Sequence, residues 1–377
     1  MPQPAVRQTP IDGEKLEDLV GLCLSGGGYR AMLFHAGAIF RMNELGLLAK
    51  LDEVSSVSGG SMTAAALAMA YAGFKYDATG VVTNLTDTFL KPILRQAADS
   101  IDVASGFAGL IPFSSAAEAA AKSYDRNLTK GKWLHELPVK PIFVFNATSL
   151  MTGNAVRFGR NYVADYRVGQ LAGVKVRLAD VVAASAAFPP FLSPSIVDLS
   201  SGKMVAGSEG PLAKDAQFTG PVTLTDGGVY DNLGTETVWK HCRTIFVSNA
   251  GRPFPDLPDP KENWLQQSLR VVDIAMDQSE DLRERILSHA YEVNARRGAM
   301  WGLNTGGDRP ENRPALLSAA EFDAARAVST RLWKMPKDTQ ALLLKAGYAH
   351  AASRLKKHYG PDKGGPADIP AANWPKP

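Results

Sequence analysis

A turn with four serines contains the first candidate for covalent chemistry. Residues 54–61 have the sequence VSSVSGGS. Ser58 follows a strand-like run and precedes two glycines. A serine at a strand-to-helix turn exposes its hydroxyl, and the helix N-terminus favours the negative charge that develops in acyl transfer. The segment matches the pattern G-x-S-x-G, with Ser56 in place of the first glycine and Gly60 as the second. Ser58 is therefore the candidate nucleophile, with Ser56 and Gly60 as small residues that support the turn.

The other serines have simpler structural interpretations. Ser55 and Ser56 fall within the expected strand, and Ser61 falls within the start of the next helix. The alternative for the whole segment is a Ser/Gly turn in which Ser61 caps a buried helix. A short motif needs support from a second element, because such matches also arise by chance.

A glycine-rich turn precedes the serine turn along the chain. Gly26, Gly27 and Gly28 follow an apolar run, and Arg30 comes shortly after them. Consecutive glycines expose backbone N–H groups that can stabilise an oxyanion, and Arg30 adds a positive charge nearby. The alternative is a dinucleotide fingerprint, which requires an acidic residue at the end of the second strand. That strand ends at residues 57–58, with its acidic residues at the beginning, so the sequence favours the oxyanion interpretation.

A serine nucleophile also needs a proton acceptor. The six histidines lie in expected helices or beside strands, and none follows a strand in a glycine turn. Asp226, Gly227 and Gly228 do follow a strand-like run, a position where α/β sheets place site residues. Aspartate has a reference pKa of about 3.9, so it acts as a base only in a partly apolar pocket. Asp226 is the predicted base, with Gly227 and Gly228 supporting its turn. Asp231 is second choice, because we expect it to face solvent.

These motifs need elements that bring them together. Residues 20–24 and 52–57 are predicted strands, and helical patterns follow at residues 30–48 and 60–74. Further strands are predicted at residues 141–147, 155–159, 222–225 and 244–248. The β-α-β-α order favours a parallel sheet covered by helices. We therefore predict a three-layer α/β/α fold with a mainly parallel central sheet and a helical C-terminal region.

Composition and segment lengths restrict the class of protein. The chain has 377 residues, two cysteines and a net charge of +3. These values indicate a protein of a reducing compartment and give no sign of a nucleic-acid partner. No apolar run approaches the roughly 20 residues that span a bilayer, and the first residues lack a signal-peptide pattern. We expect a cytoplasmic protein, peripheral at membranes at most. The expected organisation is an N-terminal lead-in (1–19), a catalytic core (20–250), a helical part of the same domain (251–358) and a mobile tail (359–377).

Together, the motifs resemble those of the patatin-like phospholipase family, over about residues 20–250. The matching segments are Gly26–Arg30 for the glycine run with a basic residue, Ser56–Gly60 for the serine elbow and Asp226–Gly228 for the Asp-Gly-Gly turn. The segment ASAAFPPF (184–191) resembles the small-residue helix before the family's aspartate. Two departures are Ala31, where many members have glycine, and Ser56, which is similar to serine-containing elbows of cytosolic phospholipase A2 relatives.

The resemblance implies a serine lipid acyl hydrolase that works through an acyl-enzyme, with no metal ion and no other cofactor. It implies Ser58 as nucleophile, Asp226 as base, and the glycine run with Arg30 as oxyanion or phosphate contacts. The implied substrate is a phospholipid or another acyl ester, with transient contact at a membrane surface. A general carboxylesterase, a dinucleotide-binding oxidoreductase and a non-catalytic lipid-binding protein are the alternatives.

Two segments are candidates for contact with lipid. Residues 101–121 have apolar residues in a glycine-rich setting and are a candidate cover or interfacial loop. A helix packed against the sheet is the competing interpretation. The basic run at 354–357 can touch anionic lipid or form a solvated helix end.

Overall fold

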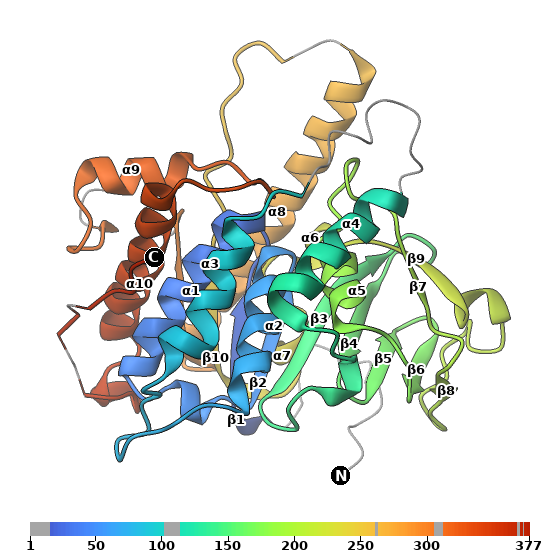
Figure 1. Cartoon of the computed structure of the whole chain (residues 1–377), viewed down its shortest axis with the longest axis horizontal. Helices are drawn as coiled ribbons and strands as arrows, with labels where there is room; N and C mark the ends of the chain where they lie inside the picture. The colour runs from blue at the N-terminus through green and yellow to red at the C-terminus, as the bar shows by residue number, and fades with distance from the viewer. Residues whose placement is uncertain (1–15, 102–113, 261–262, 305–311, 368–369, 372) are drawn as a thin grey trace.

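The structure is a computed structural model that describes residues 16–101, 114–260, 263–304, 312–367, 370–371 and 373–377. Within these residues the strands join into one sheet of 11 strands (Figure 1). The strands are β1 (Glu17–Leu24), β2 (Glu53–Val57), β3 (Ile142–Ser149), β4 (Ala155–Gly159), β5 (Tyr162–Asp165), β6 (Gly169–Ala172), β7 (Ser195–Asp198), β8 (Lys203–Met204), β9 (Pro221–Asp226), β10 (Cys242–Asn249) and β11 (Arg297–Gly302).

The sheet has a parallel half and an antiparallel half. Its main path runs β11-β10-β1-β2-β3-β4-β5-β6-β8, and β9 pairs with both β3 and β7. Neighbours from β11 to β3 are parallel, whereas the pairs beyond β3 are antiparallel. The carboxyl ends of β1 and β2 therefore lie at the same edge, as the sequence predicts.

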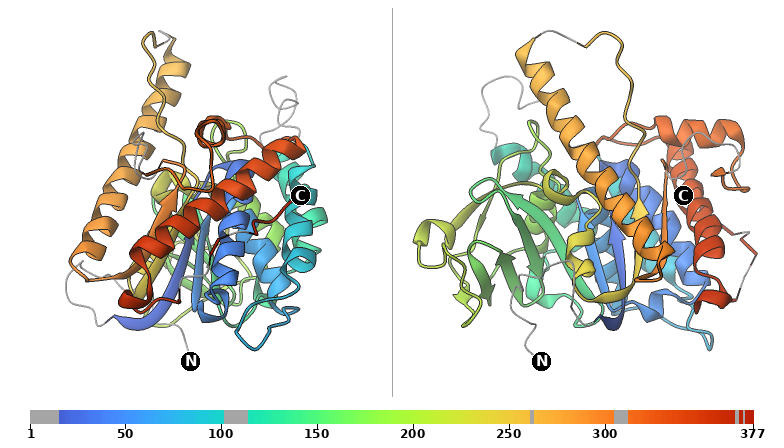
Figure 2. Two further views of the ribbon diagram at one scale, coloured as in Figure 1. Left: turned by 90° about the vertical axis from the view of Figure 1, so that its left-hand side faces the viewer. Right: turned by 180° about the vertical axis from the view of Figure 1, so that it is seen from behind.

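Helices cover both faces of this sheet (Figures 1 and 2). They are α1 (Gly28–Glu44), α2 (Gly59–Tyr71), α3 (Lys91–Ala97), α4 (Ser114–Tyr124), α5 (Leu178–Ser185), α6 (Gly228–Asp231), α7 (Thr235–Trp239), α8 (Trp264–Glu292), α9 (Ala319–Ala327) and α10 (Lys337–His358). Short 3₁₀ or π-helical turns lie at Leu48–Lys50, Thr86–Leu90, Asp125–Thr129, Leu134–Glu136, Ala216–Phe218 and Pro361–Lys363. One face carries α1 to α5 and α10, and the other carries α6, α7 and α8.

Side chains alternate between the two faces of the sheet along each strand, and this produces two hydrophobic cores, one on each face. Leu22 and Leu24 of β1 belong to the larger core, whereas Cys23 between them belongs to the smaller one. Successive strand side chains point to opposite faces, so an apolar run buried on both sides is what a covered sheet requires. The predicted three-layer α/β/α fold is confirmed.

The C-terminal region differs from its predicted helical character in one respect. It is mainly helical, but β11 pairs in parallel with β10 and extends the sheet. The short strands β5 to β8 were also absent from the prediction, because four-residue or shorter strands carry little periodic signal.

The long helix α8 projects from the body at the end of the sheet where β1 and β2 terminate (Figures 1 and 2). None of the helices in the described parts of the chain combines the length and hydropathy needed to cross a membrane. Most of the candidate cover, residues 102–113, lies outside the described residues.

Candidate active site

Ser58 lies between the end of β2 and the start of α2, in a backbone conformation that few residues adopt. Its φ is 51° and its ψ is −118°, a positive φ that is unfavourable for a side chain with a Cβ. Such strain is typical of a nucleophile turn, where it holds the hydroxyl clear of the strand and the helix. The Ser58 side chain does not cap α2. The alternative expected Ser61 to cap this helix, but Ser61 lies inside α2 and its hydroxyl donates to Ser56 Oγ.

The turn can form because glycines let two chain segments approach closely. A Cβ on Gly59 would clash with the carbonyl oxygen of Gly28, and a Cβ on Gly60 would clash with that of Leu24. The Gly60 N–H donates to Ser25 O at 3.1 Å. The serine turn and the glycine turn are thus packed directly against each other, as their positions on neighbouring strands predict.

A hydroxyl from a third segment holds the serine turn. Ser185, the last residue of α5, accepts a hydrogen bond from the Ser58 N–H at 3.0 Å. Its Oγ donates to Asn146 O at 2.6 Å and lies 2.8 Å from Ser61 Oγ. Ser61 Oγ donates in turn to Ser56 Oγ at 3.0 Å. Ser185 belongs to the segment ASAAFPPF, and no local pattern in the sequence indicates these contacts.

The three glycines of the first turn have different hydrogen-bonding states. The Gly26 N–H donates to Asn232 O at 3.1 Å, so this N–H does not point at a substrate. Among the described residues, no acceptor bonds the N–H of Gly27 or Gly28. Both have positive φ, 132° and 58°, which only glycine adopts readily. The backbone N–H groups of Gly27 and Gly28 are therefore the donors of this turn that can bind an oxyanion.

Arg30 is buried beneath the same turn, with 3% of its surface exposed. Its Nε donates to Ala250 O at 2.9 Å, and its Nη1 donates to Val328 O at 3.0 Å. Burial lowers the pKa of Arg30 to about 10, so it remains charged at neutral pH. Arg30 ties the glycine turn to the end of β10 and to the segment between α9 and α10.

Strand register places Asp226 beside the serine turn. Asp226 is the last residue of β9 and pairs with Ala147 of β3, while Val57 of β2 pairs with Asn146 of β3. Since β9 runs antiparallel to β3, its end meets β2 at the turn of Ser58. Asp226 ends a strand, as the sequence predicts, but this strand runs antiparallel to its neighbours and does not belong to the parallel half of the sheet.

Asp226 is buried and keeps one oxygen unpaired. Its Oδ1 accepts from the Gly228 N–H at 2.7 Å, whereas its Oδ2 has no hydrogen-bond partner among the described residues. Burial, partly offset by the Gly228 N–H and the nearby Ser58 hydroxyl, raises the pKa of the carboxyl to about 6. Ser58 therefore lies close enough to affect this carboxyl, without forming a completed hydrogen bond to Oδ2. The carboxyl is poised to accept a proton near neutral pH.

The turn after Asp226 depends on a glycine and on a neighbouring strand. The Gly227 N–H donates to Ser185 O at 3.1 Å. A Cβ on Gly227 would clash with Asn146 O, and one on Gly228 would lie 3.1 Å from Asp226 Oδ1. Ser185 thus contacts the turns of both Ser58 and Asp226.

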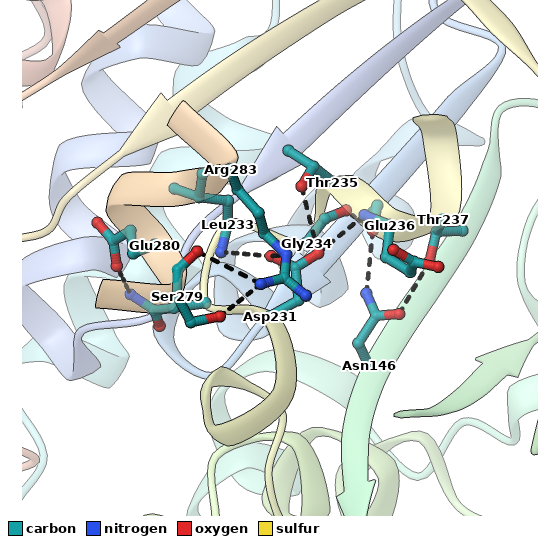
Figure 3. Close-up of polar contacts among 12 residues, drawn as sticks. Asn146, Asp231, Leu233, Gly234, Thr235, Glu236, Thr237, Ser279, Glu280 and Arg283 are labelled. Carbon is teal, nitrogen blue, oxygen red and sulfur yellow. Dashed lines mark hydrogen bonds and ion pairs between the residues drawn. The ribbon is translucent and has the colours of Figure 1, made fainter. Parts of the chain in front are cut away.

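The competing carboxylate, Asp231, is buried. The expectation from the sequence that it faces solvent is wrong. Its Oδ2 accepts from the Glu236 N–H at 2.8 Å, and its Oδ1 lies 3.3 Å from Arg283 Nε (Figure 3). Leu233 N–H also donates to Oδ1 at 3.1 Å. Asp231 is therefore a buried anchor between the α6–α7 turn and α8. A local sequence pattern cannot indicate this role, because the partner residue, Arg283, is 52 positions away in the sequence.

Histidines and potential metal ligands lie elsewhere. Within the described residues no histidine hydrogen-bonds Ser58. His35, in α1, instead contacts Ser248 Oγ at 2.7 Å and Ser25 O at 2.9 Å. The potential metal ligands that cluster among described residues are Glu53, His241 and Cys242. They lie at the amino ends of β2 and β10, opposite Ser58, and His241 hydrogen-bonds Glu53.

Known proteins resemble this chain in sequence. Residues 22–239 match the family model for "Patatin-like phospholipase". The yeast protein "Putative meiotic phospholipase SPO1" (Saccharomyces cerevisiae) is 48% identical over 42 residues, which are 11% of this chain and 7% of that protein.

Two solved structures are similar to this chain at low sequence identity. Human GIVD cytosolic phospholipase A2, in complex with methyl gamma-linolenyl fluorophosphonate and terbium chloride, is 14% identical, with a TM-score of 0.47 over 88% of this chain and 57% of that one. VipD from Legionella pneumophila is 15% identical, with a TM-score of 0.39 over 91% of this chain and 67% of that one. This chain thus spans just over half the length of the human enzyme. By the family match over more than half of its length, the chain belongs to the patatin-like phospholipase family.

Proposed function

We propose that the protein is a serine lipid acyl hydrolase that cleaves acyl esters of phospholipids or related lipids. The observation that carries the proposal is a buried carboxyl with an unpaired oxygen, Asp226 Oδ2, beside a serine on a strained strand-to-helix turn. Family membership supports the substrate class.

In the proposed reaction Ser58 Oγ attacks the ester carbonyl carbon and its proton passes to Asp226. The N–H groups of Gly27 and Gly28 stabilise the oxyanion of the tetrahedral intermediate, because they have no other acceptor in the described structure. The intermediate collapses, and the leaving alcohol takes the proton from Asp226. Water, deprotonated by Asp226, then attacks the acyl carbon, the bond to Ser58 Oγ breaks as the fatty acid leaves, and Asp226 returns the proton to Ser58 Oγ. No step uses a metal ion or another cofactor.

Arg30 and Gly26 have supporting roles in this proposal. The Arg30 guanidinium and the Gly26 N–H both donate to backbone carbonyl oxygens. They shape the turn that presents Gly27 and Gly28, and the charge of Arg30 adds a positive potential at the oxyanion. Ser56 and Gly60 support the turn of the nucleophile, and Gly227 and Gly228 support that of the base.

The dinucleotide alternative has less support. It requires a carboxylate at the carboxyl end of β2, where Val57 and Ser58 stand. Glu53, at the start of β2, is paired with His241. A purified protein with nicotinamide or flavin absorbance would favour this alternative.

The experiment is fluorophosphonate labelling of the wild type, Ser58→Ala, Asp226→Ala and the control Ser61→Ala. We expect labelling of the wild type and of Ser61→Ala, none of Ser58→Ala, and a loss of about 100-fold or more in labelling rate for Asp226→Ala. Undiminished labelling of Ser58→Ala would refute the assignment of the nucleophile.

Substrate class needs a second measurement. Hydrolysis of phosphatidylcholine vesicles identifies a phospholipase that contacts a lipid surface. Hydrolysis of short-chain esters alone identifies a general carboxylesterase of the same fold. Both outcomes leave the assignment of Ser58 and Asp226 unchanged.

A further inference from the structure

A second cavity lies at the end of the parallel strands opposite Ser58. It has a volume of about 840 Å³ and is formed by the amino ends of β10 and β11, the carboxyl ends of α8 and α10, and the segment that follows α10. A pocket for a small organic ligand typically has about 300–1,000 Å³. The cavity can therefore hold an organic molecule as well as a simple ion.

Positive charge predominates in its lining. The carboxylates are Glu292 and Asp362. The cationic side chains are those of Arg243, Arg296, Arg297, Arg354 and Lys363. These cations come from segments far apart in the sequence, so the tertiary structure creates the cluster. The basic run at 354–357, singled out in the sequence for lipid contact, contributes only Arg354.

Few of these cations have an anionic partner. Among the described residues, no ion pair within 4.0 Å involves Arg297, Arg354 or Lys363. Arg243 has only a long contact of 4.0 Å with Asp18. The Nη2 of Arg296 donates to Trp239 O, but its buried Nε has no partner in the described structure. Guanidinium groups that keep free N–H donors are suited to bind phosphate oxygens.

The electrostatic environment of His358 shows the same excess of positive charge. His358 lines the cavity, 3.4 Å from Arg354 Nη1. Burial, together with the charges of Arg354, Lys357 and Lys363, lowers the pKa of His358 to about 4. Burial lowers the pKa of Arg354, and the carboxylate of Glu284, in α8, raises it. The cavity therefore has a positive potential that an anion would neutralise.

We propose that this cavity binds a phosphate-bearing organic anion. Its location favours a soluble ligand over a lipid headgroup, because a bilayer that presents a substrate to Ser58 would meet the opposite end of the strands. The site is independent of the proposed acyl hydrolysis and contains none of its residues.

The test measures binding to the full chain by calorimetry, with inositol hexakisphosphate and inorganic phosphate as soluble probes. Phosphatidylcholine vesicles containing phosphatidic acid are the lipid probe. The variants are Arg297→Glu and Lys363→Glu, both exposed residues whose replacement leaves the core intact. The matched control is Lys175→Glu, an exposed lysine near the other edge of the sheet.

We expect inositol hexakisphosphate to bind the wild type and Lys175→Glu equally, and Arg297→Glu and Lys363→Glu at least about tenfold more weakly. Added salt should weaken this binding. If the wild type binds the vesicles but neither soluble probe, and Arg297→Glu and Lys363→Glu bind the vesicles more weakly, the phosphate belongs to a lipid headgroup. Equal binding by all four proteins, or no binding of any probe to the wild type, overturns the proposal.

Discussion

At the scale of single residues, the candidate site combines two unfavourable features. Ser58 has a positive φ of 51°, and Asp226 has a buried oxygen without a hydrogen-bond partner. Each costs folding free energy, on the order of 1–3 kcal/mol for such features. The two features lie at adjacent turns, and the proposed acyl transfer uses both of them. Local strain next to an unpaired carboxyl oxygen is what supports the assignment of the nucleophile and the base.

The pH dependence of activity follows from the pKa of Asp226. A base must be deprotonated, and burial raises this pKa to about 6. We expect kcat/KM for a short-chain ester to fall about tenfold per pH unit below pH 6 and to level off above it. A pH profile without an inflection between pH 5 and 7 would contradict the role of Asp226 as the base.

The pH dependence of stability gives an independent check on the same residue. The folded pKa of Asp226 lies above its unfolded value of 3.8, so folded protein binds this proton more tightly than unfolded protein. Its contribution to stability is therefore fully present below pH 3.8 and is lost as pH rises through about 6. Asp226→Asn should be inactive, yet more stable than wild type at pH 8 by up to about 3 kcal/mol. Urea unfolding at pH 5 and pH 8 measures this difference.

At the scale of elements, the site is the meeting point of three turns. The β1–α1 turn and the β2–α2 turn contact each other through glycine backbones, and the end of α5 joins the β2–α2 turn to the β9–α6 turn through Ser185. Ser185 bonds no reacting atom. We therefore regard it as a positioning residue for Ser58.

Replacement of Ser185 tests this positioning role. Ser185→Ala leaves the buried Ser58 N–H without its acceptor, so we expect kcat to fall by about 10- to 100-fold with KM little changed. Ser61→Ala is the matched control, because Ser61 contacts Ser185 but not the Ser58 N–H. Steady-state kinetics measure kcat and KM of both variants, and melting temperatures show whether either variant has lost stability. An equal fall of kcat in both variants, at equal stability, would argue against positioning.

At the scale of the whole molecule, segments beyond the family match complete the site. The match ends at residue 239, yet Arg30 bonds Ala250 and Val328. The helix α8 anchors the region after Asp226 through Arg283 and through Glu280, which accepts from Asn232 at 2.6 Å. The C-terminal region therefore fixes the turns that the family motifs form. The predicted division of the chain at residues 250 and 358 stays a prediction.

The ion pair of Asp231 and Arg283 provides a test of this anchoring. Arg283→Met leaves a buried carboxylate unpaired, and we expect a loss of up to about 3 kcal/mol in the free energy of unfolding at pH 8. Burial raises the pKa of Asp231 and Arg283 lowers it, so removing Arg283 raises this pKa further. Relative to wild type, the loss should therefore grow as pH rises and disappear in acid.

A double-mutant cycle makes this measurement specific. Asp231→Asn in the Arg283→Met background should restore much of the lost stability, as measured by urea unfolding. Arg285→Met is the control, because Arg285 is exposed and, among the described residues, forms an ion pair with Asp281 alone, at 3.5 Å. A loss in Arg285→Met as large as that in Arg283→Met would contradict the importance of the buried pair.

The sequence by itself determined strands β1, β2, β3 and β10 of the parallel half of the sheet, the three motifs and their order. Strand and helix periods, together with glycine turns, are local properties, so Ser58, the glycine run and Asp226 could be identified without coordinates. Only the tertiary structure decided the direction of β9, the burial of Asp231 and the position of Ser185 between two turns. It also decided which glycine N–H groups remain free and which cations gather at the second cavity. These features depend on register and on contacts between distant segments, which no local pattern encodes.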